Sequence, residues 1–329
     1  MTTAVAKAEL HCHLEGAASP DLVRRLAERH GIALPAGLFA DTGAFAWHDF
    51  TSFLAAYDAA SSCLRTGDDY RELTRDYLVA CAGEGAIYVE LFASPDHAAV
   101  VGLDYAALID GIAAGIDDAA AAHGITARII VTCIRHLGPE RAGRIVDAMC
   151  AAPHAYVVGF GMAGDETVGE VADFAPAFAA AADAGYGCTV HAGELAGADS
   201  VRAALAALPV SRIGHGVRAV EDPDLLVELA RRGTVLEVCP GSNIAVGVYS
   251  DYASHPLPRL LAAGCRVTLN SDDPAYFATS IGAEYDRAAT AFGLDDEDLG
   301  AITATALDAA FVDAGTRRRL TQRLAEAAA

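Results

Sequence analysis

Eight short apolar segments alternate with helix-like segments along the 329-residue chain, and this alternation constrains the fold more than any other feature. Strands that are joined by helices run parallel, and eight such units can close a barrel. No Gly-x-Gly-x-x-Gly motif follows the first apolar segment, which disfavours a dinucleotide-binding open sheet. We therefore predict an α/β fold, a (β/α)8 TIM-type barrel. The predicted strands are residues 8–14, 86–93, 128–134, 156–161, 187–191, 212–215, 234–238 and 266–270.

The helical segments predict one domain, residues 1–329, with additions to a plain barrel. Ser19 and Pro20 are typical of a helix start, and Gly31 is typical of its end. Further helices are expected at 50–64 and 68–82, before the second strand, so we interpret residues 31–85 as an insertion and a candidate lid. Residues 279–329 are expected to form a helical tail. The other predicted helices are residues 105–122, 139–151, 171–184, 199–207, 223–232 and 256–263.

The composition excludes several classes of partner. The net charge of −21 argues against nucleic acid and anionic membranes, because both bind clustered Lys and Arg. We find no run of about 20 apolar residues and no secretory leader, so no membrane span is expected. The eight cysteines form no Cys-x-x-Cys pair and several lie in apolar runs, which favours a reducing, cytoplasmic location. A small-molecule partner remains, and the sequence leaves the oligomeric state open.

The first strand carries His11 and His13, which form half of a possible metal site. Side chains alternate between the two faces of a strand, so these imidazoles point to the same side and Cys12 points to the other. Zinc accepts neutral imidazole nitrogens but needs three or four ligands. A His-x-His pair alone is as often structural as metal-binding.

Other strand ends supply the missing residue types. A lone strand-end histidine such as His215 is more often structural, and Asp272-Asp273-Pro274 alone is typical of a turn. Unrelated structural needs rarely place such residues together at the carboxyl end of one barrel, where active sites lie. The combination therefore predicts a metal-dependent site. The strand-end segments are Thr189-Val190-His191-Ala192-Gly193-Glu194, Ile213-Gly214-His215-Gly216, Glu237-Val238-Cys239-Pro240-Gly241-Ser242-Asn243 and Leu269-Asn270-Ser271-Asp272-Asp273-Pro274.

As an ordered set, these motifs resemble the adenosine deaminase family of zinc aminohydrolases, whose fold is a (β/α) barrel. The resemblance covers nearly the whole chain. It rests on His11-Cys12-His13-Leu14-Glu15-Gly16, Met162-Ala163-Gly164-Asp165-Glu166, His191-Ala192-Gly193-Glu194, Gly214-His215-Gly216, Cys239-Pro240-Gly241-Ser242-Asn243 and Ser271-Asp272-Asp273-Pro274.

The resemblance implies a role for each matching residue. One Zn²⁺ per chain is expected, with the ligands His11, His13, His191 and Asp272. Glu194 matches the proton donor, and His215 matches the histidine that orients and deprotonates the attacking water. Asp273 matches a second carboxylate that contacts the water or purine N7. Gly164 matches the backbone group that meets purine N3, and Glu15 matches the substrate-facing carboxylate.

The implied reaction is hydrolytic deamination of a 6-aminopurine. Zinc lowers the pKa of water to near ~7, and a buried Glu194 would be protonated and able to donate to N1. Adenosine, or a deoxy or modified adenosine, is the first-ranked substrate. Adenine is the alternative, because adenosine-specific members usually carry Asp, facing the ribose, where this chain has Glu15.

Four further alternatives are weighed against this prediction. Another mononuclear-zinc amidohydrolase, acting on amides or lactones, would share the metal ligands but need not keep the spacing from His191 to Glu194. A non-catalytic relative would be expected to lose a ligand or the acid, and none is lost. Two-metal hydrolases need a lysine on a middle strand, whereas Lys7 is the only lysine here; the cytidine-type deaminase signature is also absent.

One face of the helix predicted at 50–64 has two interpretations. Phe50, Phe53, Leu54 and Tyr57 share this face, and they form either ordinary core or an apolar gate over the base.

Overall fold

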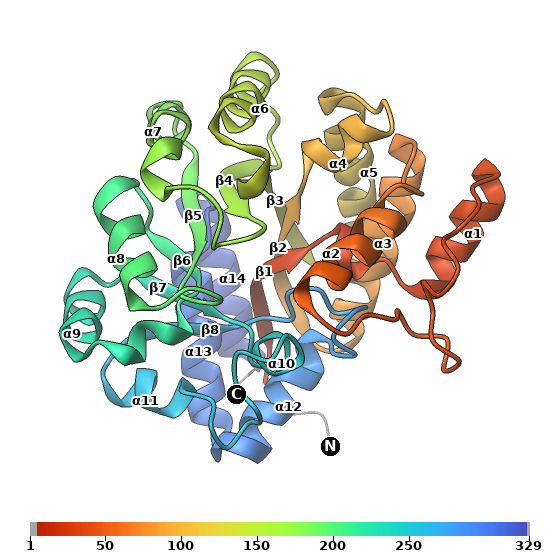
Figure 1. Cartoon of the computed structure of the whole chain (residues 1–329). Coiled ribbons are helices and arrows are strands. Elements are labelled where there is room, and N and C mark those ends of the chain that lie inside the picture. Colours follow the sequence, from red (N-terminus) through yellow and green to blue (C-terminus); the bar gives the residue numbers. More distant parts are fainter. Residues whose placement is uncertain (1–4, 328–329) are drawn as a thin grey trace.

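The computed structural model describes residues 5–327 and contains the predicted barrel (Figure 1). Eight strands lie side by side in chain order, and every neighbouring pair from β1 to β8 is parallel. Their residues are buried almost throughout, as expected for parallel strands that are covered on both faces. The strands are β1 (Lys7–His13), β2 (Ala86–Ala93), β3 (Thr126–Ile134), β4 (Val157–Ala163), β5 (Gly187–Ala192), β6 (Arg212–His215), β7 (Val235–Val238) and β8 (Arg266–Leu269).

The helices surround this barrel, as Figure 1 shows. The first one begins and ends as predicted: the Ser19 side chain accepts a hydrogen bond from the Leu22 N–H, and Gly31 closes the helix in the left-handed conformation. The helices are α1 (Pro20–His30), α2 (Phe50–Ser61), α3 (Gly67–Gly83), α4 (Pro95–Val100), α5 (Tyr105–His123), α6 (Pro139–Ala151), α7 (Ala175–Asp183), α8 (Ala198–Ala207), α9 (Pro223–Arg232), α10 (Pro240–Ala245), α11 (Leu257–Ala262), α12 (Ile281–Phe292), α13 (Asp296–Ala309) and α14 (Ala314–Ala327).

Two features of the structure concern short or interrupted helices. The six-residue helices α4 and α10 were not predicted, because six residues carry too little periodicity. The predicted tail is helical, and it consists of the three helices α12, α13 and α14. It is interrupted where Gly293 takes a left-handed conformation and again after Ala309; its last two residues lie outside the described range. Among residues 5–327, no helix is long and apolar enough to cross a membrane.

The barrel closes between β8 and β1 largely through loop and side-chain atoms. The Asp272 N–H donates to the His11 carbonyl at 3.1 Å, and the His13 N–H donates to the Asp272 carbonyl at 2.8 Å. Below these bonds, the Leu10 N–H donates to Asn270 Oδ1 at 2.9 Å. His11, His13 and Asp272 therefore complete the barrel with their backbone atoms, and the same three residues are predicted metal ligands.

A β-bulge interrupts β1 directly before that site. Glu9 lies opposite Val89 of β2, whereas Cys12 lies opposite Leu91, so three steps along β1 match two along β2. Bulges re-aim the side chains that follow them. Here Leu10 joins an apolar cluster with Tyr88, while the next residue, His11, faces the site.

Candidate active site

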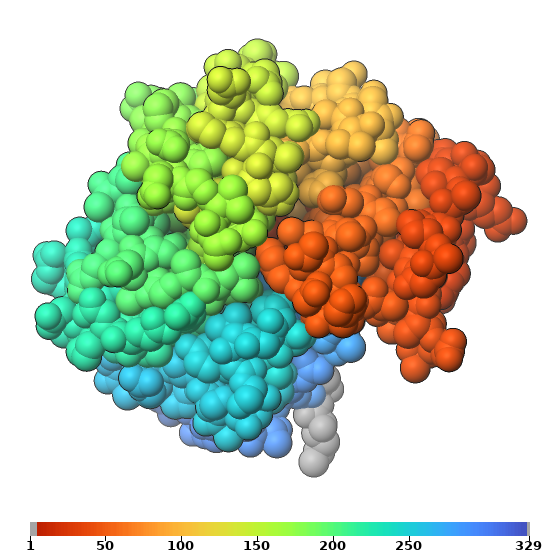
Figure 2. All heavy atoms as spheres, in the orientation of Figure 1, coloured from red at the N-terminus to blue at the C-terminus, as the bar shows by residue number. Residues whose placement is uncertain are grey.

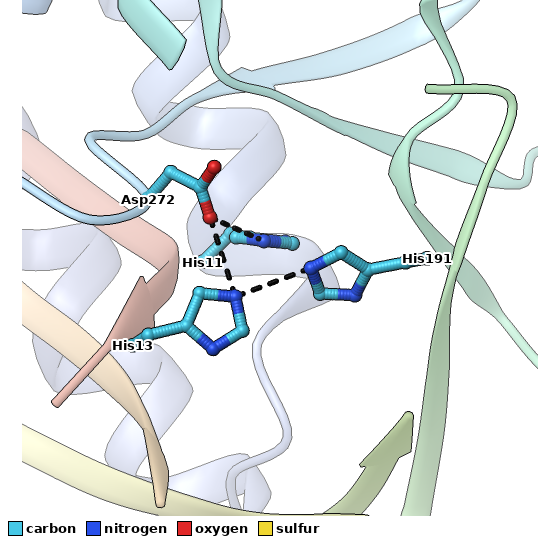
Figure 3. A group of neighbouring side chains, drawn as sticks. All are labelled: His11, His13, His191 and Asp272. Carbon is cyan, nitrogen blue, oxygen red and sulfur yellow. Dashed lines mark hydrogen bonds and ion pairs between the residues drawn. The ribbon is translucent and has the colours of Figure 1, made fainter. Parts of the chain in front are cut away.

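Three histidines and an aspartate converge at the carboxyl end of the barrel (Figure 3). His11 and His13 come from β1, His191 comes from β5, and Asp272 follows β8. The Nε2 atoms of His13 and His191 are 3.1 Å apart. Asp272 Oδ1 lies 3.2 Å from His11 Nε2 and 3.3 Å from His13 Nε2.

Hydrogen bonds on the far side of two rings set which nitrogen faces this group. His191 Nδ1 lies 2.9 Å from the Met162 carbonyl oxygen, which can only accept, so Nδ1 carries the proton and Nε2 keeps its lone pair. His11 Nδ1 lies 2.8 Å from Glu237 Oε2 and is held in the same way. A carboxylate or carbonyl behind a histidine is the usual support of a metal-ligating imidazole.

The group fits a divalent metal. Nitrogen and oxygen ligands lie about 2.0–2.2 Å from zinc, so ligands that share one ion are roughly 3–3.5 Å from one another, close to the separations found here. His11 Nε2 and Asp272 Oδ1 are buried and have no hydrogen-bond partner. Burial disfavours a charge on Asp272, but the imidazoles of His11 and His13 beside its carboxylate outweigh burial and hold the pKa of Asp272 well below its usual range. An anionic oxygen beside inward-facing imidazole lone pairs is a site for a cation.

Glu194, His215 and Asp273 lie around this cluster, as the sequence predicts. His215 Nε2 is 3.6 Å from Glu194 Oε2 and 3.9 Å from Asp272 Oδ2, too far for direct hydrogen bonds. Burial, followed by the nearby charges of Asp272 and Glu166, raises the pKa of Glu194 well above its usual range. Burial, followed by the nearby charge of Asp272, also raises the pKa of Asp273 well above its usual range. Both carboxyl groups are therefore suited to donate a proton.

Two of these residues have unusual backbones. His215 has φ of 59° and Asp272 has φ of 65°, the left-handed region that non-glycine residues rarely adopt. His215 is the last residue of β6 and Asp272 follows β8, so each lies where the chain leaves the barrel. Strain of this kind costs roughly 1–3 kcal/mol per residue and persists where the surrounding structure enforces it, often at functional sites.

Gly16 is required for close packing against Asp273. A Cβ atom at position 16 would lie 1.8 Å from Asp273 Oδ1. The glycine in the first motif therefore makes room for a carboxylate that is more than 250 positions later in the chain.

Glu166 was quoted in a motif but given no role, and it orders the loop that carries Glu194. Its carboxylate accepts hydrogen bonds from the backbone N–H groups of Gly193 (2.5 Å), Glu194 (3.0 Å), Leu195 (2.8 Å) and Ala196 (3.0 Å). The Ser200 hydroxyl also donates to it. An acidic residue next to a left-handed glycine at a strand end was the signal that could have identified it.

The predicted substrate residues line one cavity of about 260 Å³ beside the metal cluster. Gly164 lies on its wall with φ of 95°. Glu15 also borders the cavity, but its carboxylate is buried and accepts hydrogen bonds from the Ser94 N–H (3.0 Å) and the Tyr70 hydroxyl (3.3 Å). His11 lies behind the cavity wall; the other predicted site residues all border it.

Helix α2 forms one side of the cavity mouth. Phe50, Phe53, Leu54 and Tyr57 all border the cavity, and Phe53 and Tyr57 are also largely buried in the core. The core and gate interpretations therefore both describe this face. In Figure 2 the orange atoms of α2 lie beside the narrow hollow at the centre of the visible face.

Comparison with known proteins agrees with this geometry. The adenosine deaminase family model matches residues 6–327. The chain belongs to the adenosine deaminase family. Members of this family are hydrolytic deaminases that act on purine C–N bonds, so the predicted family, fold and enzyme class are confirmed.

Relatives within the family point to a narrower group. The chain is 54% identical to an adenine deaminase of Chelativorans sp. over 318 residues, which is 97% of each chain. It is 53% identical to an adenine deaminase of Mesorhizobium japonicum over 98% of this chain and 99% of the relative. These names favour the adenine alternative over the first-ranked adenosine prediction.

Two solved structures agree with this chain in fold, and one of them contains bound Zn. An adenine deaminase from Arthrobacter aurescens superposes with a TM-score of 0.90 at 30% identity, covering 98% of each chain. An amidohydrolase from Burkholderia ambifaria, solved with bound Zn, has a TM-score of 0.89 at 29% identity and covers 99% of this chain and 92% of its own. The bound Zn of this relative and the His/Asp cluster described above support a divalent metal site in this chain.

Proposed function

We propose that the chain is a zinc-dependent adenine deaminase, which converts adenine and water to hypoxanthine and ammonia. The observation that carries this proposal is its identity of more than 50% to adenine deaminases over nearly the full length of both chains. The position of Glu15 is compatible with it. Ser94 and Tyr70 both donate to Glu15 Oε1 and fix the orientation of a side chain that borders the cavity.

Zinc suits the donor set. Imidazoles bind Zn, Cu, Fe and Ni, and three imidazoles with one carboxylate leave a position open for water. In this proposal His11, His13, His191 and Asp272 hold one ion, which supplies Lewis-acid activation of the attacking water. The related amidohydrolase with bound Zn supports the choice of metal.

The protein groups around the cavity divide the remaining work. Glu194, kept protonated by burial, donates its proton to purine N1 as water adds at C6. His215 orients the water, Asp273 contacts purine N7, and the Gly164 N–H meets N3. Loss of ammonia from C6 then gives the product: of the two protons of the water, one completes the ammonia and the other returns to Glu194.

An ammonia-release screen with parallel metal analysis tests this function. The substrates are adenine, adenosine, deoxyadenosine, 5′-modified adenosines and cytidine. We expect the highest kcat/KM for adenine, with one zinc per chain. A higher kcat/KM for adenosine than for adenine would favour the adenosine prediction instead. The proposal would be overturned if neither purine released ammonia or if the native metal were not zinc.

A matched variant tests the part played by Glu15. Glu15→Asp shortens the side chain by one methylene and keeps the charge. If Glu15 fills the space that a sugar needs, this variant should gain activity on adenosine relative to adenine. An unchanged ratio would remove Glu15 from the account of specificity.

A further inference from the structure

A chain of buried hydrogen bonds runs from the backbone of α11 to His215, and its first donor cannot be reversed. The Leu257 N–H donates to His255 Nδ1 at 3.2 Å. A backbone N–H only donates, so this nitrogen of His255 holds a lone pair. Burial lowers the pKa of His255 to about 4, which keeps the ring neutral at pH 7. A neutral imidazole has one N–H, and that of His255 must lie on Nε2.

The direction of this first bond fixes the two that follow. His255 Nε2 lies 3.2 Å from Asn243 Oδ1, which therefore accepts. The other end of the same amide, Asn243 Nδ2, lies 3.2 Å from His215 Nδ1 and therefore donates. His215 Nδ1 is thus an acceptor, and the proton of neutral His215 lies on Nε2. Turning the amide round would leave His255 with two acceptor nitrogens and no proton.

The Nε2–H of His215 points to the reacting side of the site. His215 borders the cavity, and its Nε2 is buried without a hydrogen-bond partner in the protein. Its nearest acidic groups are Glu194 and Asp272, at 3.6 and 3.9 Å. Asn243 and His255 are themselves buried, and the His255 ring packs beside Tyr249 and Phe292, so water does not compete for these bonds.

We propose that Asn243 and His255 are positioning residues that hold His215 in the Nε2–H form, so that His215 meets the attacking oxygen as a hydrogen-bond donor. This inference rests on the proposed deaminase function. A donor aimed at the oxygen that adds to C6 stabilises the negative charge that develops there. It departs from the base role that the family resemblance implies, because a nitrogen that already carries a proton cannot accept another.

The state of His215 can be measured without any assay of activity. The metal-loaded protein is labelled with ¹⁵N-histidine, and the spectrum of His215→Gln identifies the two nitrogens of His215 by their loss. We expect a protonated, pyrrole-type signal for Nε2 and an unprotonated, pyridine-type signal for Nδ1. A protonated Nδ1 and an unprotonated Nε2 would overturn the proposal even if adenine is the substrate. A protonated Nε2 would support it even if adenine is not the substrate.

Three variants then connect this state to catalysis. Asn243→Asp accepts at both ends, so it should move the His215 proton to Nδ1 and lower kcat by about tenfold or more with metal content unchanged. His255→Gln places an amide donor near the position of Nε2 and should retain the wild-type His215 spectrum and kcat. His255→Leu keeps bulk but loses this donor, and should give mixed His215 signals and reduced kcat.

Two results would contradict the catalytic part of the proposal. If Asn243→Asp moves the proton to Nδ1 and keeps or raises kcat, His215 acts as a base. If His255→Gln and His255→Leu give the same spectrum and the same kcat, His255 does not set the state of His215. The wild-type spectrum remains decisive if a variant fails to fold.

Discussion

The two ends of strand β6, only three residues apart, are opposite kinds of environment. Arg212 begins the strand between two buried carboxylates: its side chain lies 2.6 Å from Glu90 and 2.6 Å from Glu237, and its guanidinium carbon lies 3.7 Å from the centre of the Phe311 ring. His215 ends the strand in the left-handed conformation with an unpartnered Nε2. We call Glu90, Arg212 and Glu237 the amino-end layer, and His11, His13, His191, His215 and Asp272 the carboxyl-end layer.

The difference shows how one barrel separates stability from function. In the amino-end layer, Arg212 lies 2.6 Å from each of two carboxylates, so its charged groups contact one another rather than a ligand. In the carboxyl-end layer, strained backbones remain, and the inward-facing nitrogens of His11 and His215 lie 3.2 and 3.6 Å from the nearest carboxylate oxygens. Glu237 belongs to both environments, because one oxygen pairs with Arg212 and the other supports His11.

The largest expected effect comes from Glu194→Gln in the loop beside the carboxyl-end layer. The amide keeps the shape of the acid but has no proton of suitable acidity to give to N1. We expect kcat/KM to fall by about 10²–10⁴-fold, with metal content and thermal unfolding unchanged. Steady-state assays, metal analysis and calorimetry measure these quantities. Full activity in this variant would remove Glu194 as the proton donor.

Arg212→Met is the counterpart in the amino-end layer. It leaves Glu90 and Glu237 buried without their shared cation, so we expect the free energy of unfolding to fall by about 3–5 kcal/mol. Denaturant unfolding measures it. Arg75→Met is a matched control, because Arg75 pairs with Asp76 at the exposed surface and should change little. If Arg212→Met retains wild-type stability but loses its metal, the two layers are not separate.

Cys12→Ala should have the smallest effect and tests the boundary of the metal site. The thiol is buried and interacts with Tyr77, on the opposite side of β1 from His11 and His13. We expect unchanged metal content and kcat, and a loss of about 1 kcal/mol of stability from the small cavity. Metal analysis of the purified variant is the check. Loss of metal would place Cys12 among the ligands.

Residue patterns within single segments predicted much of this structure. The eight strands formed where apolar runs met helix signals, and Ser19 and Gly31 set the ends of the first helix because both act on neighbouring backbone atoms. The metal cluster followed from the family motifs and from the rule that parallel strands end on one side. The roles of its residues stay predictions until the variants are measured.

Long-range partners were not predictable in the same way. Nothing near Glu237 in the sequence indicates that it joins Arg212 to His11, and nothing near Glu15 indicates that Ser94 holds it. The bulge in β1 was also missed, because its cause lies in the register against β2 rather than in β1 alone. Each of these features depends on distances that exist only after the barrel closes.

The sequence by itself determined the order of the strands, the end of the barrel that carries the site and the residue types that meet there. These follow from side-chain periodicity and from the common direction of parallel strands. Only the tertiary structure decided which nitrogen of His215 carries the proton. That choice begins at the backbone N–H of Leu257 and passes through His255 and Asn243, so it depends on three contacts between separate segments. A hydrogen bond has a direction, and the fold alone brings its donor to its acceptor.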